Sequence, residues 1–394
     1  MIMRLVLISA VLFSSIATSD SGLDEKANQI NAAIALGEET DELKLLSKAY
    51  RFLEQYALIP GVPESEISER ILSGSLKVLV GPLRKSLAET VHMLCANQGA
   101  FSERKKLLLG AFNLAVLQDG AKSKHDLLVD VLAGMIAALD DPHALYSPPI
   151  DISSTGTDGG VEHPTTSVAS EPQKVMGPIK VARFTFAKSE NVVLVIRVDF
   201  FSRPDVVLLP QLLSTVGSAK GDEYEYVIID VRANPGGMLS AAEMFSDLFL
   251  PEGSAIAEQI LKNGSSLSMV ASSARFASQA KQIVLVDRWT ASASEIVAKS
   301  LQKNGAVVIG EKTYGKGTGQ QPILLGPAGQ FGALKFTVSQ MSVGGELLDH
   351  VGVHPDIPAI TDADDWRYCS GTTDLHREIC SQISNLPITR IVYE

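Results

Sequence analysis

Hydrophobic residues recur at helical spacing through the first third of the chain. In LKLLSKAYRFLEQYAL (43–58) and HDLLVDVLAGMIAALDD (125–141), apolar residues stand three and four positions apart, which predicts amphipathic helices. Between them, Pro60-Gly61-Val62-Pro63 breaks the pattern and an acidic run from Glu64 restarts it. We therefore expect a helical domain over residues 18–146.

Two helical segments share a pattern. ILSGSLKVLVGP (71–82) and VLAGMIAALDDP (131–142) place Gly74 over Gly134. Two explanations fit this shared pattern: a duplicated helical hairpin, or a chance agreement between two amphipathic helices. The fold prediction depends on neither explanation.

A polar segment and then an alternating one follow the helices. Ser, Thr, Gly, Pro and Asp dominate residues 147–178, which is typical of a linker or a mobile loop. From Ile179, strand-like runs such as NVVLVIRVDF and QIVLVD alternate with helix-like runs such as MLSAAEMFSDLF. This alternation predicts an α/β domain over residues 179–360, with a mainly parallel sheet covered by helices, and a C-terminal tail over 361–394. In such sheets, sites form at the carboxyl ends of strands.

The N-terminal residues MIMRLVLISAVLFSSIATSD have the features of a secretory signal. A positive residue, a short apolar core and a small-residue cleavage site follow one another. We expect a signal peptide over residues 1–17 and a periplasmic or secreted protein; an uncleaved membrane anchor is the alternative. In an oxidising compartment, Cys369 and Cys380 would pair in the polar tail and Cys95 would stay buried and reduced. Three free thiols are the other possibility for these residues.

Composition limits the range of partners. The 394 residues, 45% of them hydrophobic, suffice for a large core and for two domains. The net charge is −11 and the chain has no basic block. We therefore expect no nucleic-acid partner.

Three hydroxyl residues crowd one junction of the expected α/β domain. Thr290, Ser292 and Ser294 lie between the strand QIVLVD and the helix SEIVAKSLQKNG. A serine here would be held beside free backbone N–H groups and the positive helix end, where an oxyanion is stabilised. Capping is the alternative, because Ser292-x-x-Glu295 is a capping-box pattern and Ser294 could cap the helix by itself.

Lys316 stands between Gly315 and Gly317, just past a strand. Flanking glycines let the backbone approach other parts of the chain closely. A serine nucleophile needs a base, and a lysine serves only when it is neutral. Because an exposed lysine has a pKa of ~10.4, burial would have to lower it by ~3 units, at a cost of ~4 kcal/mol. A solvated surface lysine is the alternative.

The residues around Lys316 nearly match the sequence pattern of a phosphate-binding loop. Gly310 and Gly315-Lys316 fit that pattern, but Gly317 stands where Ser or Thr is required and no helix follows. Nucleotide binding is therefore not expected.

A third stretch, from Asp230 to Gly237, runs from a strand into Pro-Gly-Gly and a helix. Its glycine pair can present a bare backbone N–H to a ligand as an oxyanion donor. An ordinary strand-to-helix turn is the alternative. We expect Asp230 and Arg232 to be structural rather than catalytic.

Together, VIIDVRANPGGMLSAAEMFSDLFLPEG, VDRWTASASEI, GEKTYGKGTGQQ and VGVHPDI resemble the C-terminal processing peptidase (tail-specific protease) family. The run AGMIAALDDPHALY also resembles that family's helical segment, so the likeness covers roughly residues 110–150 and 179–360. Members are serine endopeptidases with a Ser/Lys dyad on a fold like that of the crotonase and Clp protease groups. The resemblance implies an exported endopeptidase that acts on polypeptides and uses no cofactor and no metal ion.

The motifs of the family can be carried over residue by residue. They place the nucleophile on Ser292, the base on Lys316 and a lysine-orienting glutamine on Gln320. The oxyanion hole would use the backbone N–H of Ala293 and that of Gly236 or Gly237.

The chain departs from the family at three places. Residues 147–178 are far too few for the PDZ domain that members usually carry there, which puts their grip on a substrate's C-terminus by strand addition in doubt. The interval from Ser292 to Lys316 is one residue shorter than is common, and the missing residue falls near Gly305-Ala306. Lys303 stands where an acidic residue is often found.

A binding protein on the same scaffold that has lost proteolysis is the competing hypothesis. Retention of the serine, lysine, glutamine and paired glycines favours the enzyme. For the helical domain, the sequence does not separate a homo-oligomer interface from a lid. It also leaves open whether an activator protein takes part.

Overall fold

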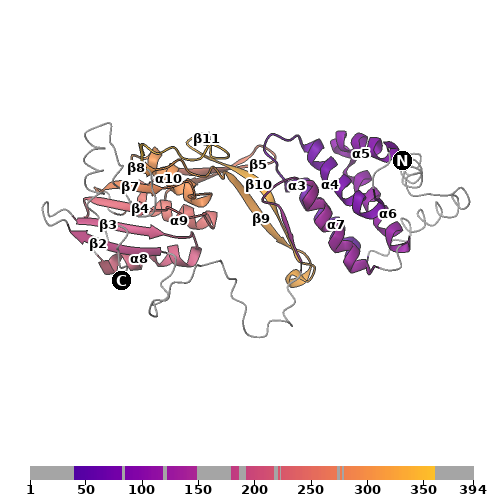
Figure 1. The fold of residues 1–394 in the computed structure, drawn as a ribbon, viewed down its shortest axis with the longest axis horizontal. Helices are drawn as coiled ribbons and strands as arrows, with labels where there is room; N and C mark the ends of the chain where they lie inside the picture. Colours follow the sequence, from indigo (N-terminus) through magenta and orange to yellow (C-terminus); the bar gives the residue numbers. More distant parts are fainter. Residues whose placement is uncertain are drawn as a thin grey trace, which may run out of the picture. The chain divides into compact units, whose positions relative to one another are not determined.

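The computed structural model describes residues 40–81, 85–118, 122–148, 179–185, 192–216, 221, 223–272, 276 and 279–359 (Figure 1). The predicted signal peptide, nearly all of the predicted linker, Cys369 and Cys380 lie outside these residues. No helix in the described ranges is long and apolar enough to cross a membrane. The chain divides into two compact units: Met1–Thr165 with Gln320–Ser339, and Thr166–Gly319 with Gln340–Glu394.

The first unit consists mainly of helices. They are α3 (Asp41–Tyr56), α4 (Glu64–Val80), α5 (Lys85–Ala96), η1 (Gln98–Ala100), α6 (Phe101–Gln118) and α7 (Lys124–Ala138), with η3 (Pro327–Gly329) later in the chain. The side chains of Thr40 and Ser123 cap α3 and α7 by accepting backbone N–H groups of their first turns. Strand β1 (Leu145–Ser147) pairs antiparallel with the start of β10 (Ala333–Val343), and β9 (Thr318–Leu324) also pairs with β10.

Two glycines let α4 and α7 cross closely. A Cβ added to Gly74 would lie 2.4 Å from the Cβ of Ala138 and 2.5 Å from the carbonyl oxygen of Gly134. Around this crossing, apolar side chains of all five helices form one core. The alignment of Gly74 with Gly134 seen in the sequence therefore corresponds to a packing contact.

A buried ion pair and a buried thiol lie inside the first unit. The guanidinium of Arg104 donates to Glu54, to the carbonyl of Leu94 in the last turn of α5 and to the carbonyl of Asn97 just after that helix. Cys95 is a free cysteine, as expected, and only 2% of its surface is exposed. Burial raises the pKa of the Cys95 thiol to about 12.

The second unit contains a six-stranded sheet with the order β12-β8-β7-β4-β3-β2. Its strands are β2 (Ile179–Thr185), β3 (Val192–Val198), β4 (Tyr226–Asp230), β7 (Lys281–Val286), β8 (Val307–Gly310) and β12 (Ile357–Pro358). All neighbours run parallel except β2 and β3. The mainly parallel sheet is thus confirmed.

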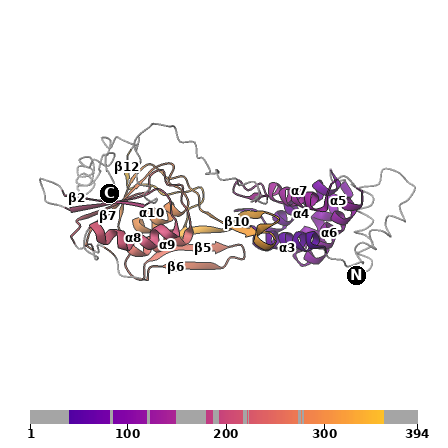
Figure 2. The same ribbon diagram turned by 90° about the horizontal axis from the view of Figure 1, so that it is seen from below.

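Three helices cover one face of this sheet (Figures 1 and 2): α8 (Arg203–Val216), α9 (Leu239–Phe249) and α10 (Ala293–Lys303). Every residue of β4 is buried, because the opposite face also packs into a core. Antiparallel β5 (Ala255–Leu261) and β6 (Ser266–Val270), and β11 (Glu346–Leu347) beside the end of β10, complete the unit. The loops after β3, β4, β7 and β8 leave the same end of the sheet, where the sequence predicts a site.

Candidate active site

The Pro-Gly-Gly turn after β4 is held by hydrogen bonds on both sides. Asn234 donates from its side chain to Val198 O at 2.8 Å and accepts the N–H of Gly236 at 2.9 Å. Phe201 donates to Gly236 O, and Met238 donates to Phe201 O, both at 2.9 Å. A Cβ on Gly237 would lie 2.2 Å from Phe201 O, so this close approach requires glycine.

Asp230 and Arg232 stabilise the start of that turn. Asp230 is fully buried and accepts two bonds from the Arg232 guanidinium, at 2.8 and 2.7 Å. Arg197 on β3 adds a third bond to Asp230 at 3.0 Å. Both charged groups are thus occupied within the fold, which fits the structural role expected for them.

Two of the three crowded hydroxyls are structural. Thr290 and Ser294 are fully buried; Thr290 donates to Val231 O at 2.9 Å and Ser294 donates to Asn234 O at 3.2 Å. Asp287 accepts the backbone N–H of Thr290 and, at 2.9 Å, that of Ala233. These bonds tie the turn after β7 to the turn after β4.

Ser292 differs from its neighbours in backbone and burial. It stands directly before α10 and is only partly buried. Its φ of 58° lies in the left-handed region, which costs a non-glycine residue on the order of 1–3 kcal/mol. Such strain persists only where the surroundings over-determine the backbone, and it is common at functional sites.

The Gly-Gly turn packs directly on the Ser292 turn. A Cβ on Gly236 would lie 2.8 Å from the Cβ of Ser292 and 3.0 Å from the backbone nitrogen of Ala293. The structure therefore brings together Gly236, Ser292 and Ala293, three of the residues singled out in the sequence.

Glu295 joins the Ser292 turn to the lysine loop, a role that the sequence did not reveal. This carboxylate is fully buried on α10 and accepts the backbone N–H of Ser292 at 2.8 Å. It also accepts the N–H of Gly315 at 2.7 Å, the N–H of Lys316 at 2.8 Å and the hydroxyl of Thr313. The predicted capping box supplied a signal for the first bond only.

The glycines beside Lys316 let its loop pack closely against residues 348–353. A Cβ on Gly317 would lie 2.0 Å from Asp349 N, and Gly315 O accepts the N–H of His350 at 2.8 Å. Lys316 itself is half-buried. Gln320 is also partly buried and donates to Thr337 Oγ1 at 3.3 Å within the first unit.

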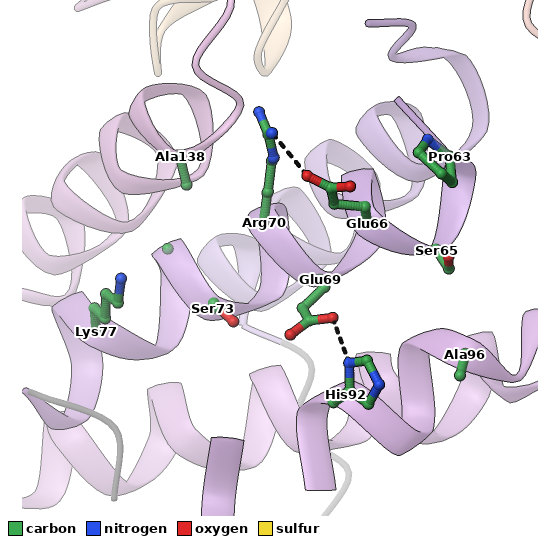
Figure 3. Close-up of a pocket in the computed structure, with 11 residues that line it drawn as sticks. Pro63, Ser65, Glu66, Glu69, Arg70, Ser73, Lys77, His92, Ala96 and Ala138 are labelled. Carbon is green, nitrogen blue, oxygen red and sulfur yellow. Dashed lines mark hydrogen bonds and ion pairs between the residues drawn. The ribbon is translucent and has the colours of Figure 1, made fainter. Parts of the chain in front are cut away.

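Among the described residues, no group of three His, Cys, Asp or Glu side chains could hold a metal ion. A pocket of about 650 Å³ lies on α4, between α5 and the end of α7 (Figure 3). In this pocket Arg70 pairs with Glu66 at 2.8 Å and His92 with Glu69 at 2.9 Å, and Lys77 also lines it. The predicted catalytic residues do not line it.

Comparisons with known proteins show which family the second unit resembles. Residues 193–359 match the model of peptidase family S41. The chain is 34% identical over 138 residues to the carboxy-terminal-processing protease of Bartonella bacilliformis, covering 34% of this chain and 31% of that protein. It is 34% identical over 151 residues to the carboxy-terminal processing protease CtpA of Bacillus subtilis, covering 38% and 32% respectively.

The chain therefore spans about a third of the length of these curated relatives. Among solved structures, the photosystem II D1 C-terminal processing protease is similar in fold. The TM-score is 0.56 at 15% identity, with 83% of this chain and 95% of that chain covered. The resemblance that the sequence motifs carry is confirmed: residues 193–359 match peptidase family S41, and the curated relatives named here are carboxy-terminal processing proteases.

Proposed function

We propose that the protein is an exported serine endopeptidase that hydrolyses polypeptides with Ser292 as nucleophile and Lys316 as base. The observation that carries this proposal is the strained Ser292 at the head of α10, packed against the Gly236-Gly237 turn. The S41 domain supports it, because the carboxy-terminal processing proteases of that family are serine peptidases. The predicted crotonase-like or Clp-like fold, the domain limits and the export signal belong to the same proposal.

In the proposed reaction, Ser292 Oγ attacks the scissile carbonyl and neutral Lys316 takes the hydroxyl proton. Lys316 then passes that proton to the leaving amine, and water hydrolyses the acyl-enzyme. Gln320 would orient the amine of Lys316. Four bonds to Glu295 hold the two loops in register, so the reacting groups start in a fixed geometry.

The oxyanion hole is proposed to use the N–H groups of Gly237 and Ala293. The sequence left Gly236 and Gly237 as alternatives, and the N–H of Gly236 already donates to Asn234. Gly237 is the more exposed of the two, which leaves its N–H better placed to meet a substrate oxygen.

The test compares wild type with Ser292→Ala and Lys316→Met on unfolded casein. Both variants should lose cleavage, whereas the matched controls Ser268→Ala on β6 and Lys312→Met should keep it, since both of those side chains are exposed. If Ser292→Ala cleaves casein as fast as wild type, or if none of the proteins cleaves it, the competing binding function would be favoured.

A further inference from the structure

Two large aromatic side chains stand exposed on the loops that carry Ser292 and Lys316. Trp289 is 61% exposed and Tyr314 is 62% exposed. Trp289 lies on the loop after β7, shortly before Ser292, and Tyr314 lies on the loop after β8, shortly before Lys316. Large apolar groups left in water near a site are typical of surfaces that bind a partner.

The backbones of these two residues are fixed and joined. Trp289 donates its N–H to Asp287 at 2.9 Å, and Tyr314 donates its N–H to Thr290 O at 3.0 Å. Thr290 is fully buried, so this link is anchored in the fold. Fixed backbones with exposed rings suit recognition, because little conformational freedom of the loop is lost on binding.

The charges near the rings offset one another. The Arg288 guanidinium lies 5.6 Å from the centroid of the Trp289 ring, and its nearest nitrogen lies 3.9 Å from Glu311. This ion pair carries no net charge, so the rim beside Trp289 suits an apolar side chain better than a charged one.

We propose that Trp289 and Tyr314 form a specificity subsite, called here the aromatic subsite, for a large apolar side chain of the polypeptide substrate beside its scissile bond. This inference rests on the proposed function. The occupant is the substrate because the same two loops carry the candidate nucleophile and base. A chain bound there presents its neighbouring peptide bond to them.

The experiment first maps the bonds that wild type cleaves in casein by mass spectrometry. Paired peptides are then made that differ only by Phe or Ala at the residue flanking the cleaved bond. Wild type should favour the Phe peptide at least ~10-fold in kcat/KM. Trp289→Ala and Tyr314→Ala should bring that ratio close to one by slowing the Phe peptide only, and Trp289→Phe should keep it.

Tyr56→Ala is the matched control, since Tyr56 is 42% exposed on α3 and takes no part in the site. A preference that is unchanged in both aromatic variants overturns the proposal. A binding assay distinguishes failure of the aromatic subsite from failure of the proposed function. In a Ser292→Ala background, the Phe peptide should bind at least ~10-fold more tightly than the Ala peptide, and Trp289→Ala should abolish the difference. If wild type cleaves no bond, a casein peptide that contains Phe and its Ala counterpart serve in the same binding assay. Equal binding of the two peptides overturns the subsite in either case.

Discussion

Replacing Glu295 with glutamine should loosen the link between the Ser292 turn and the lysine loop. One carboxylate oxygen accepts the Thr313 hydroxyl and the Gly315 N–H, and the other accepts the N–H groups of Ser292 and Lys316. In one orientation, the NH2 group of glutamine faces the N–H groups of Ser292 and Lys316. In the other, it faces the Gly315 N–H and the Thr313 hydroxyl, which can turn and accept a hydrogen bond from it. At least one backbone N–H therefore loses its acceptor.

An unsatisfied buried donor costs ~1–3 kcal/mol, so Glu295→Gln should lower the free energy of unfolding by ~1–3 kcal/mol. A typical domain is stabilised by only ~5–15 kcal/mol in total, so this loss is measurable. In molecules that remain folded, displacement of the loops by about 1 Å should reduce kcat by on the order of 100-fold. KM should change little, because the substrate does not touch Glu295.

The assay combines urea denaturation with steady-state cleavage of a peptide. Glu258→Gln is the matched control, because Glu258 is exposed on β5 and should behave as wild type. Correct folding of each variant is checked by circular dichroism before the kinetics. If Glu295→Gln unfolds at the wild-type urea concentration and keeps the wild-type kcat, the reasoning about this buried carboxylate is wrong.

Three further predictions test other parts of the structure. Gly74→Ala should lower the free energy of unfolding by about 2 kcal/mol through the clash with Ala138, measured by urea denaturation, whereas Gly99→Ala, with no neighbour closer than 3.4 Å, should not. Gly237→Ala should abolish cleavage because its Cβ meets Phe201 O, whereas Gly253→Ala shares a positive φ without the clash and should stay active; equal activities would contradict this. In folded protein, iodoacetamide should not alkylate Cys95 near pH 8, and rapid labelling of the native protein would refute this expectation. The contribution of the raised Cys95 pKa to the free energy of unfolding should be present below pH 9 and decline towards pH 12.

Much of the second unit could be predicted from its pattern. In YVIID and QIVLV every residue is buried, and all are apolar or aromatic except Asp230 and Gln282, because parallel strands under helices are covered on both faces. The same pattern placed the Gly236-Gly237 and Ser292 turns at one sheet edge, and the contact between them follows from that placement. A proline inside a helix favours a late start or a kink, and Pro210 lies inside α8. The structure has α8 begin at Arg203, since Val206, Leu209 and Leu213 bury their side chains against the sheet.

The role of Glu295 could not be predicted in the same way. Its partners Thr313 and Lys316 lie 18 and 21 residues further along the chain, and only the folded backbone shows that their N–H and hydroxyl groups converge on one carboxylate. Nor could the sequence place residues 320–339 with the helices. Their alternating pattern is that of any strand, and the contact of Thr337 O with Leu58 N depends on tertiary packing.

The most direct measurement is to trap the acyl-enzyme. A cleavable peptide is mixed with the protein, the reaction is quenched in acid within milliseconds, and the modified residue is located by mass spectrometry. The account predicts an acyl group on Ser292 that is absent from Lys316→Met. An acyl group on another residue, or undiminished turnover by Ser292→Ala, would contradict it.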